Sequence, residues 1–376
     1  MNRLCIYVVY DKDGIIDDYI PYFLNALKPF VRHMIIVCNG NLNDEGRAKL
    51  SQFTEDVFVR PNEGYDAGAV RDTLLNLYGW EKILQFDELL IANDTFYAPL
   101  YPLDECFGKM DAMNVDFWGW LLHREQLYNE LHLSEYVQSY FYNIKSRMLH
   151  SHDFMQYFKQ MKTAINAYEA FRYYEENLSV YFAQKGYTYG TYLKPLKETI
   201  GVNYNPFIDD AVELVEDFHC PFIKRKALQR GVSDVDANQY ETRKSTLLEL
   251  VNEIGYDSRL ILNHLDRIGN PIFTLLQPKE VWLDFAIQAK KIYIYGAGNY
   301  AAMVATVLEK HSIDYMGFIV TDGHAKHDEF HSHPCVYLSE VKFDDDTGVI
   351  LGLDSKNRAQ VEPLLVERGM KNFIAV

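Results

Sequence analysis

The sequence has no long apolar segment. None of the apolar runs in its 376 residues reaches the roughly 18 residues that suggest a membrane-spanning helix. The N-terminus also lacks a positively charged segment followed by a cleavable apolar stretch, so no secretion signal is predicted. We therefore expect a cytoplasmic protein.

Basic charge is scarce. Lys and Arg total 37 against 53 Asp and Glu, which gives a formal net charge of −16. Nucleic-acid binders usually need a basic face, so we expect no nucleic-acid partner. The local exception is Lys224-Arg225-Lys226, followed by Arg230. This run is either a solvated charged turn or a contact for anionic lipid headgroups, which would add peripheral association with the inner face of the membrane.

Cysteine offers no framework for the fold. The five cysteines are scattered, and no two form a C-x-x-C pair. This spacing fits reduced cytosolic thiols better than a set of disulfides. The sequence also lacks internal repeats and low-complexity tracts, so the core must come from ordinary secondary structure.

Strand and helix patterns alternate through the first 120 residues. Apolar, β-branched runs predict strands, and apolar residues at helical spacing predict the helices between them. The expected strands are Leu4–Tyr10, Met34–Cys38, Asp56–Val59 and Leu89–Ala92, and the expected helices are Ile16–Phe30, Glu45–Phe53 and Ala67–Tyr78. Such alternation indicates βα units around a mostly parallel sheet, whose ligands sit beyond the carboxyl ends of the strands. Asp11, Asn39, Asn62 and Asp94 all fall at such ends.

The rest of the chain divides by pattern. Residues 125–186 are predicted to be helical and aromatic, with Tyr136, Tyr140, Phe141 and Ile144 on one helix face. Residues 238–290 are helix-rich, and an α/β rhythm returns from Lys291. We therefore predict an α/β protein with a mostly parallel sheet in residues 1–232, a helical connector in 233–288 and a small Rossmann-like domain in 289–376.

The loop between the third strand and the third helix carries Asn62, Gly64, Asp66 and Gly68 within seven residues. Glycines let a backbone approach a ligand closely, and the N–H groups at the following helix start can bind negative charge. Asp66 could accept hydrogen bonds from sugar hydroxyls. On spacing alone, an ordinary Asn/Gly/Asp turn is the favoured interpretation of the loop.

Asn93, Asp94 and Thr95 end the fourth expected strand. A carboxylate there can hold a divalent cation, which in turn holds a diphosphate. Only one carboxylate is present, and an Asn-Asp pair can also simply begin a turn.

Six short motifs occur in a fixed order. They are Asn62-Glu63-Gly64-x-Asp66-x-Gly68, Asn93-Asp94-Thr95, Asp116-Phe117-Trp118-Gly119, Gln138-Ser139-Tyr140-Phe141, Tyr174-Glu175 with Ser179, and Pro221-Phe222-Ile223-Lys224. Together they resemble the rhamnan synthesis protein F family of glycosyltransferases over about residues 4–230. The family often has a His two residues before the Gln-Ser-Tyr-Phe segment, where this chain has Tyr136, with His132 four residues earlier.

The resemblance implies a GT-A-like nucleotide-sugar fold and transfer of a sugar from a nucleotide-diphosphate donor. It favours rhamnose from dTDP-rhamnose, an inverting mechanism, and a bacterial surface glycan or lipid-linked acceptor. Asp94 becomes the expected ligand of Mg²⁺ or Mn²⁺. The expected donor-site residues are Asn62, Gly64, Asp66, Gly68, Arg71, Asn93, Thr95, Lys224 and Arg225, and the expected acceptor-site residues are Trp118, Gln138 and Tyr140.

The reaction needs a base for the acceptor hydroxyl and positive charge for the leaving diphosphate. Glu175 is the preferred base, with Asp116 and Asp66 as rivals. If Glu175 has no such role, it lies on a solvated helix face beside Glu176. Lys224 and Arg225 are the expected cations, since Lys binds phosphate as a point charge and Arg as a fork.

The C-terminal part carries a second glycine turn. Gly296-x-Gly298-x-x-Ala301 follows an expected strand, and Asp322 ends the next one, as in dinucleotide-binding folds. The same turn also serves packing in domains that bind no nucleotide. Two alternative functions therefore remain: an NAD(P)-dependent oxidoreductase using this domain, and a non-catalytic assembly protein. The last candidate is a histidine-rich segment. A polar surface loop is a better interpretation than a metal site for His324, His327, His331 and His333.

Overall fold

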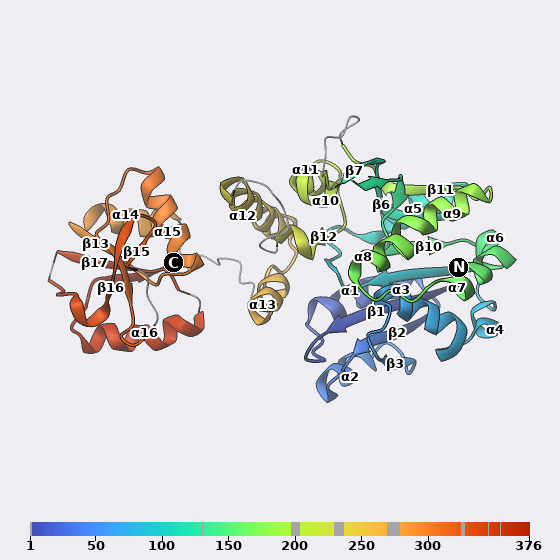
Figure 1. Ribbon diagram of the computed structural model, residues 1–376, viewed down its shortest axis with the longest axis horizontal. Helices are drawn as coiled ribbons and strands as arrows, with labels where there is room; N and C mark the ends of the chain where they lie inside the picture. The colour runs from blue at the N-terminus through green and yellow to red at the C-terminus, as the bar shows by residue number, and fades with distance from the viewer. Residues whose placement is uncertain are drawn as a thin grey trace. The chain divides into compact units, whose positions relative to one another are not determined.

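The computed structural model describes residues 2–128, 131–196, 204–228, 237–268, 279–324, 328–344, 346–353 and 355–376. The chain forms two compact units, Met1–His264 and Leu265–Val376 (Figure 1). Among the described residues, no helix has both the length and the apolar character needed to cross a bilayer. The three-part division at residues 232 and 288 stays a prediction.

The first unit alternates strands and helices. Its strands are β1 (Arg3–Asp11), β2 (His33–Gly40), β3 (Val57–Arg60), β4 (Glu88–Asn93), β5 (Phe96–Tyr97), β6 (Phe117–His123), β7 (Gln126–Tyr128), β8 (Leu131–Leu133), β9 (Tyr136–Val137), β10 (Phe141–Ile144), β11 (Tyr189–Leu193) and β12 (Ile223–Lys224). Its α-helices up to residue 254 are α1 (Tyr19–Leu27), α2 (Asp44–Leu50), α3 (Tyr65–Asp72), α4 (Trp80–Ile83), α5 (Leu103–Ala112), α6 (Ser146–Leu149), α7 (His152–Gln160), α8 (Ala167–Ala170), α9 (Glu176–Gln184), α10 (Pro206–Asp209), α11 (Ala211–Glu216) and α12 (Ala237–Ile254). Short helical turns of other types are η1 (Lys28–Phe30), η2 (Thr73–Leu77), η3 (Phe171–Glu175) and η4 (Arg225–Leu228).

The main sheet of this unit has the strand order β11-β6-β10-β4-β1-β2-β3, with β9 added beside β6. β1 pairs in parallel with β2 and β4, and β2 with β3. β10 is antiparallel to both of its neighbours, so β6 runs in the same direction as β4. This pairing confirms the predicted α/β class and mostly parallel sheet, and it places the ends of β1 to β4 at one edge.

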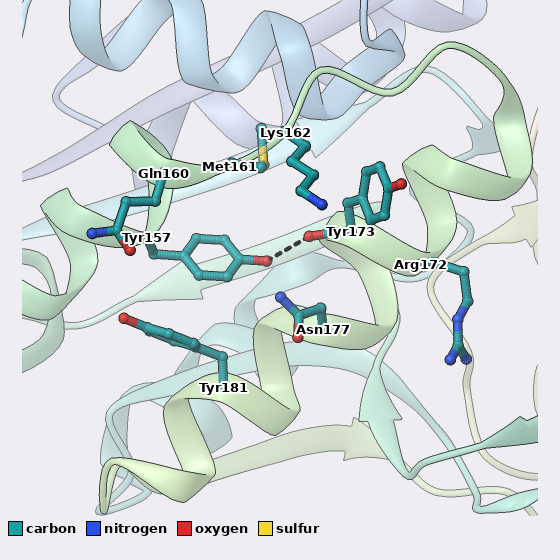
Figure 2. Close-up of a pocket in the computed structure, with 8 residues that line it drawn as sticks. All are labelled: Tyr157, Gln160, Met161, Lys162, Arg172, Tyr173, Asn177 and Tyr181. Carbon is teal, nitrogen blue, oxygen red and sulfur yellow. Dashed lines mark hydrogen bonds between the residues drawn. The ribbon is translucent and has the colours of Figure 1, made fainter.

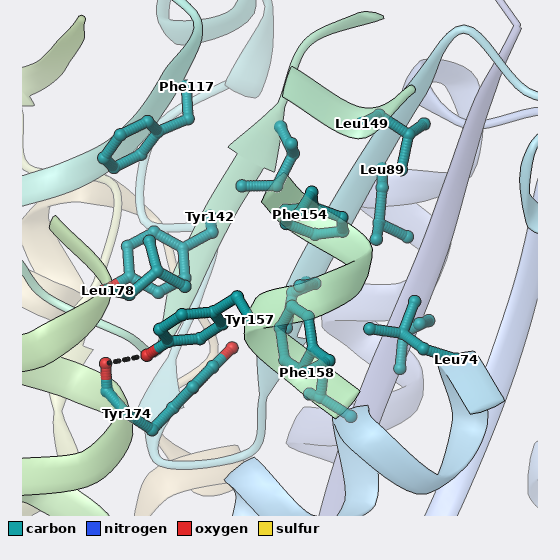
Figure 3. Close-up of a cluster of buried hydrophobic side chains, with 14 of the residues drawn as sticks. Leu74, Leu89, Phe117, Tyr142, Leu149, Phe154, Tyr157, Phe158, Tyr174 and Leu178 are labelled. Atoms are coloured by element: carbon teal, nitrogen blue, oxygen red, sulfur yellow. Dashed lines mark hydrogen bonds between the residues drawn. The ribbon is translucent and has the colours of Figure 1, made fainter. Parts of the chain in front are cut away.

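Continuous burial holds the sheet together. All six residues of β4 are buried, as expected for a strand covered on both faces. Figure 3 shows side chains from β4, β6, β10 and the helices α7 and α9 meeting in one cluster, including Leu89, Phe117, Tyr142, Phe158 and Leu178. Each such side chain contributes about 1.5–3 kcal/mol on burial. The cluster therefore fixes α9, and the turn η3 before it, against the sheet.

The helical prediction for residues 125–144 is wrong. Tyr136 lies in β9, and Phe141 and Ile144 lie in β10. All four residues of β10 are buried between β4 and β6, so the strand shows none of the apolar–polar alternation that identifies a half-exposed strand. The prediction holds for the second half of this region, where α7, α8, η3 and α9 are helical.

The second unit contains another sheet with the order β15-β16-β14-β13-β17-β18, parallel except between β15 and β16. Its strands are β13 (Lys291–Tyr295), β14 (Gly317–Val320), β15 (Glu329–Phe330), β16 (His333–Tyr337), β17 (Thr347–Leu351) and β18 (Phe373–Ala375). Its helices are α14 (Lys279–Gln288), α15 (Asn299–Lys310), η5 (Leu338–Glu340) and α16 (Ser355–Glu367), and the boundary between the two units falls within α13 (Arg259–Arg267). The α/β rhythm expected from Lys291 is present in this unit, and it begins with β13.

Candidate active site

A buried arginine organises the loop between β3 and α3. The guanidinium of Arg60 donates to Asn39 Oδ1 at 2.6 Å and to the carbonyl of Glu63 at 2.7 Å. It also pairs with Asp72 on the following helix, Nε to Oδ2 at 2.9 Å. Hydrogen bonds to a charged donor are stronger than neutral ones, so this set holds the loop in one shape. Sequence reasoning missed Arg60, although a cation at the end of an apolar run was the available signal.

The two glycines of this loop serve its shape. Gly64 has φ +72°, in the left-handed region that glycine adopts without strain. A Cβ on Gly68 would lie 2.2 Å from the carbonyl oxygen of Glu63. The shape of the loop therefore requires glycine at both positions, in addition to any role in binding the donor.

We expect Gly68→Ala to destabilise the protein by about 1–3 kcal/mol, because the added Cβ must displace backbone. The measurement is the free energy of unfolding from a denaturant titration. Gly108→Ala is the matched control, since nothing lies within 4 Å of a Cβ there, and alanine should be neutral or stabilising in that helix. Equal stability of the two variants would contradict the packing argument.

Asp66, on the first turn of α3, is joined to the end of β4. Asn93 Nδ2 donates to Asp66 Oδ2 at 2.8 Å. The Oδ1 atom of Asn93 in turn accepts from the Thr95 hydroxyl at 2.6 Å. The first and second motifs thus form one hydrogen-bonded chain along the carboxyl edge of the sheet.

The sixth motif completes this chain from far along the sequence. β12 pairs with β5 in antiparallel fashion, which places Lys224 opposite Phe96. The ammonium of Lys224 donates to the Thr95 hydroxyl and lies 3.8 Å from the centre of the Tyr140 ring. A cation–π contact of this kind helps to offset the cost of burying the charge. Lys224 therefore reaches the Asn93-Asp94-Thr95 turn, as the sequence predicted.

Arg225 is held against Asp94. Its Nη1 atom lies 3.2 Å from Asp94 Oδ2 and 3.1 Å from the hydroxyl of Tyr19. Asp94 also accepts, at 3.4 Å, from the backbone N–H of Tyr10 at the end of β1. The carboxylate thus sits between two donors, one of them a permanent cation.

Burial shifts the proton affinities of this cluster. Desolvation raises the pKa of Asp66 to about 6, and the neighbouring Asp94 charge adds to the rise. The pKa of Asp94 is also raised by burial, against the lowering effect of Arg225. Burial lowers the pKa of Lys224, while the nearby Glu175 carboxylate opposes that change. Perturbed groups gathered in one place are typical of active sites.

The raised pKa of Asp66 predicts a pH-dependent stability. The folded chain binds this proton more tightly than the unfolded chain does, so the stabilisation is complete below the usual carboxyl pKa and is lost as pH rises through about 6. We expect Asp66→Asn to raise the free energy of unfolding at pH 7.5 by about 1–2 kcal/mol, with the difference disappearing near pH 4. Denaturant titrations at both pH values test this. Asp104→Asn, at an exposed position, is the control, and an Asp66→Asn variant less stable than the parent at pH 7.5 would contradict it.

Glu175 faces the same region. It ends the π-helical turn η3, a feature often found at functional sites. The hydroxyl of Ser139 donates to Glu175 Oε2 at 2.7 Å. The neighbouring Glu176 is buried and paired with Arg172, so the alternative of a solvated helix face is wrong. Ser139 belongs to the fourth motif and was missed as a site residue.

The expected acceptor residues are enclosed. Trp118 is 0% exposed, Gln138 1% and Tyr140 2%. Trp118 packs edge-on against Phe107 of α5, whereas Tyr140 borders the site through its contact with Lys224. None of the three offers an open surface on which a sugar could stack. Their role as acceptor contacts stays a prediction.

Among the contacts found in the described part of the chain, none joins three further predicted residues to this cluster. Asp116 is bound by Arg147 and by the backbone N–H of Thr188 at 2.7 Å. It precedes β6, whose first residue is level with the start of β4, so it lies at the opposite edge from Asp94. Arg71 donates to the Thr163 hydroxyl at 2.9 Å. Asn62 is exposed on the loop.

The basic run does not form a basic surface. Lys224 is buried, Arg225 is partly buried against Asp94, and Lys226 is exposed. Arg230 lies outside the described residues. β12 turns the first of these side chains inward, so a lipid contact built on all three together is not supported by their placement.

In the second unit, the glycine turn is tightly packed. A Cβ on Gly296 would lie 2.7 Å from the carbonyl oxygen of Gly352, which itself approaches Ala301. Gly298 has open space, and Asp322 accepts from the backbone N–H of Ser339 at 3.0 Å. The turn therefore has a packing role, and nucleotide binding by these residues stays a prediction.

The ligand atoms of the chain decide whether the expected Mg²⁺ or Mn²⁺ could bind. Within the described ranges, no group of three or more His, Cys, Asp or Glu residues could hold a metal ion. That result covers His324, His331 and His333, and His327 lies outside the described residues. Mg²⁺, however, is commonly held by one or two carboxylates plus substrate phosphates. The charge of Asp94 raises the pKa of Asp66, and a bound cation would relieve that repulsion. These oxygen donors fit Mg²⁺ or Mn²⁺.

The comparisons with known proteins agree with the motifs. The model of the family described as rhamnan synthesis protein F matches residues 34–343. An uncharacterized protein, y4gN of Sinorhizobium fredii (strain NBRC 101917 / NGR234), is 21% identical over 184 residues, which is 49% of this chain and 46% of that protein. The match thus spans less than half of the relative's length.

Two solved structures are also similar. Glucosyl-3-phosphoglycerate synthase of Mycobacterium tuberculosis, in complex with Mn²⁺ and UDP, is 12% identical over 39% of this chain and 58% of its own, with a TM-score of 0.25. A protein described as a nucleotide-diphospho-sugar transferase from Desulfovibrio desulfuricans G20 is 9% identical over 68% of this chain and 100% of its own, with a TM-score of 0.33. TM-scores this low do not establish a shared mechanism.

Proposed function

Since this chain belongs to the rhamnan synthesis protein F family, a family of polysaccharide synthesis, we propose that it is a glycosyltransferase. It moves a sugar from a nucleotide-diphosphate donor to a growing glycan. The observation that carries the proposal is the position of Lys224, which is buried beside Thr95 and within the electrostatic reach of Glu175 and Asp66. A buried cation among carboxylates, at the carboxyl edge of a mostly parallel sheet, suits an anionic ligand bearing hydroxyl groups.

Lys224 and Arg225 act on the diphosphate. The bond from the sugar to the diphosphate breaks as negative charge grows on the leaving oxygen, and fixed positive charge stabilises that state. Lys224 binds as a point charge and Arg225 as a fork that Asp94 already orients. Neither side chain has to reorganise before the bond breaks.

Glu175 takes the proton of the acceptor hydroxyl. As in glycoside hydrolysis, the sugar passes through an oxocarbenium-like transition state. The acceptor oxygen forms the new bond to the anomeric carbon, its proton moves to a Glu175 carboxylate oxygen, and the diphosphate leaves with the electron pair. Ser139 positions the carboxylate through its hydrogen bond. Attack opposite the leaving group inverts the anomeric centre.

Asp66 and Asn93 orient the donor hydroxyls, and the Asn62–Gly68 loop covers them. When bound, Mg²⁺ or Mn²⁺ would be held by Asp94 and Asp66 and would supply further positive charge to the diphosphate. We favour rhamnose from dTDP-rhamnose as the donor and a surface glycan or lipid-linked acceptor, reached from the cytoplasmic side of the membrane. The family description supports the sugar.

The alternative functions have less support. A dehydrogenase using Gly296, Gly298 and Asp322 leaves the Asp66–Lys224 cluster without a purpose, and a non-catalytic assembly protein has no need of buried carboxylates facing a buried cation. We retain the three-part organisation, with residues 1–232 catalytic, 233–288 connecting and 289–376 Rossmann-like, as part of the proposal.

A thermal-shift screen of nucleotide sugars and NAD(P), each with and without Mn²⁺, tests this choice. A donor at about 100 times its Kd adds about 2.7 kcal/mol of stability, so we expect a nucleotide sugar to raise the melting temperature by about 2–4 °C. Mn²⁺ should increase that shift. A shift with NAD(P) and none with any nucleotide sugar would overturn the proposal in favour of the oxidoreductase.

A further inference from the structure

An open pocket lies between α7 and the η3–α9 segment, and Asp66, Asp94, Glu175 and Lys224 do not line it. Its volume is about 450 Å³, within the range of about 300–1,000 Å³ that small-molecule sites occupy. Figure 2 shows its lining: Tyr157, Gln160, Met161, Lys162, Arg172, Tyr173, Asn177 and Tyr181. Neither the motifs nor the proposed chemistry uses any of these side chains.

Aromatic rings and polar side chains together line the pocket. Two partly exposed tyrosines, Tyr173 and Tyr181, offer ring faces, and two exposed carboxamides, on Gln160 and Asn177, offer both donors and acceptors. Aromatic faces pack against the C–H faces of sugar rings, while carboxamides bind the hydroxyls at their edges. A purely apolar ligand would displace water from these exposed carboxamides without replacing its hydrogen bonds, at a cost in free energy. The chemistry therefore suits a saccharide.

The pocket is firmly built. The hydroxyl of Tyr157 donates to the carbonyl of Tyr173 at 3.1 Å, and the rings of Tyr157 and Tyr181 are 5.0 Å apart. The ammonium of Lys162 lies 5.8 Å from the centre of the Tyr173 ring, and no ion pair is found for it among the described residues. The rim thus presents a cation and an aromatic face that remain available to a ligand.

The same elements carry the proposed site. Tyr173 and Glu175 both belong to η3. They are two residues apart, so their side chains point to different sides of the turn: Glu175 toward Ser139, and Tyr173 into the pocket. On the opposite wall, the carbonyl of Met161 accepts from Arg71 at 3.3 Å, and Arg71 lies on the helix that carries Asp66. A sugar in the pocket would therefore contact η3, which carries Glu175, and Met161, which is bonded to the helix of Asp66.

We propose that this pocket is a subsite for the acceptor glycan, binding sugar units of the growing chain at a distance from the unit that reacts. The inference rests on the proposed glycosyltransferase function. It also accounts for the enclosure of Trp118, Gln138 and Tyr140, because the acceptor then has a different aromatic surface on which to bind.

The test compares two variants by two measurements. Tyr173→Ala and Lys162→Ala change the rim, and Tyr168→Ala is the matched control, since Tyr168 is 52% exposed on the neighbouring helix and does not line the pocket. The first measurement is direct binding of an α-linked rhamnose trisaccharide and of maltotriose by saturation-transfer NMR. The second is the KM for a monosaccharide glycoside and for an oligosaccharide acceptor.

We expect Tyr173→Ala to lower trisaccharide binding at least tenfold and to raise the KM of the oligosaccharide acceptor alone, with kcat and donor affinity unchanged. Lys162→Ala should have a smaller effect in the same direction, and Tyr168→Ala none. Equal binding by Tyr173→Ala and the parent would overturn the subsite, as would failure of both trisaccharides to bind a protein that still binds a nucleotide sugar. Absence of nucleotide-sugar binding would instead count against the proposed function, so the two failures are distinguishable.

Discussion

Glu175→Gln lowers kcat by about 10²–10⁴-fold, the usual contribution of a general base. Glutamine keeps the shape of the side chain and can still accept the hydrogen bond of Ser139, so the fold and the donor site should be preserved. What is lost is the capacity to take the acceptor proton. The measurement is single-turnover transfer at saturating donor, together with the Kd of the donor.

The matched control for this substitution is Glu169→Gln. Glu169 lies one to two turns earlier in the same helical segment, and its carboxylate bonds the backbone N–H of Ile165. We expect its turnover and donor affinity to equal those of the parent protein. A Glu175→Gln protein that turns over within about threefold of the parent would exclude Glu175 as the base, and Asp66 would become the next candidate.

Lys224→Met lowers donor affinity by about 10–100-fold. A hydrogen bond to a charged group contributes about 1.5–3 kcal/mol, and methionine removes the charge while its side chain can still cover the ring of Tyr140. The expected result is a higher Kd for the nucleotide sugar and for the free nucleoside diphosphate alike, because the lost contact is with phosphate. Calorimetric titration of both ligands measures it.

Lys226→Met is the matched control, because Lys226 stands two residues further on and is exposed. It removes the same charge from the chain and should leave both dissociation constants unchanged. If the two variants weaken donor binding equally, the loss comes from the lower positive charge of the chain as a whole. The buried position of Lys224 would then have no special part in binding.

The agreement between prediction and structure is closest where the pattern is local. β1 and β2 were found within a residue or two, since an apolar run between turn signals is a property of a few neighbouring residues. The same kind of local pattern placed Asp94 at the end of a strand. The helical prediction at β10 was wrong because it too relied on a local pattern. A strand that is buried on both faces lacks the apolar–polar alternation that identifies a strand in the sequence.

The site itself depends on contacts that span the chain. Lys224 meets Thr95 across 129 residues, and this contact exists because β12 pairs with β5. No spacing in the sequence predicts that pairing; the resemblance to a family suggested which motifs belong together, and the structure shows how they meet. Ser139 and Glu175 are brought together in the same way, across 36 residues.

By itself, the sequence determined the α/β class, the family, and the polar residues at the carboxyl edge of the sheet, because periodicity and short motifs are local. The tertiary structure alone decided which of those residues act together. It enclosed Trp118 and Gln138, moved Asp116 to the far edge, and joined Asp66, Asp94, Glu175 and Lys224 at one place. The physical reason is that burial and long-range strand pairing set both the neighbours and the charge of a side chain, and neither is encoded within a few residues of it.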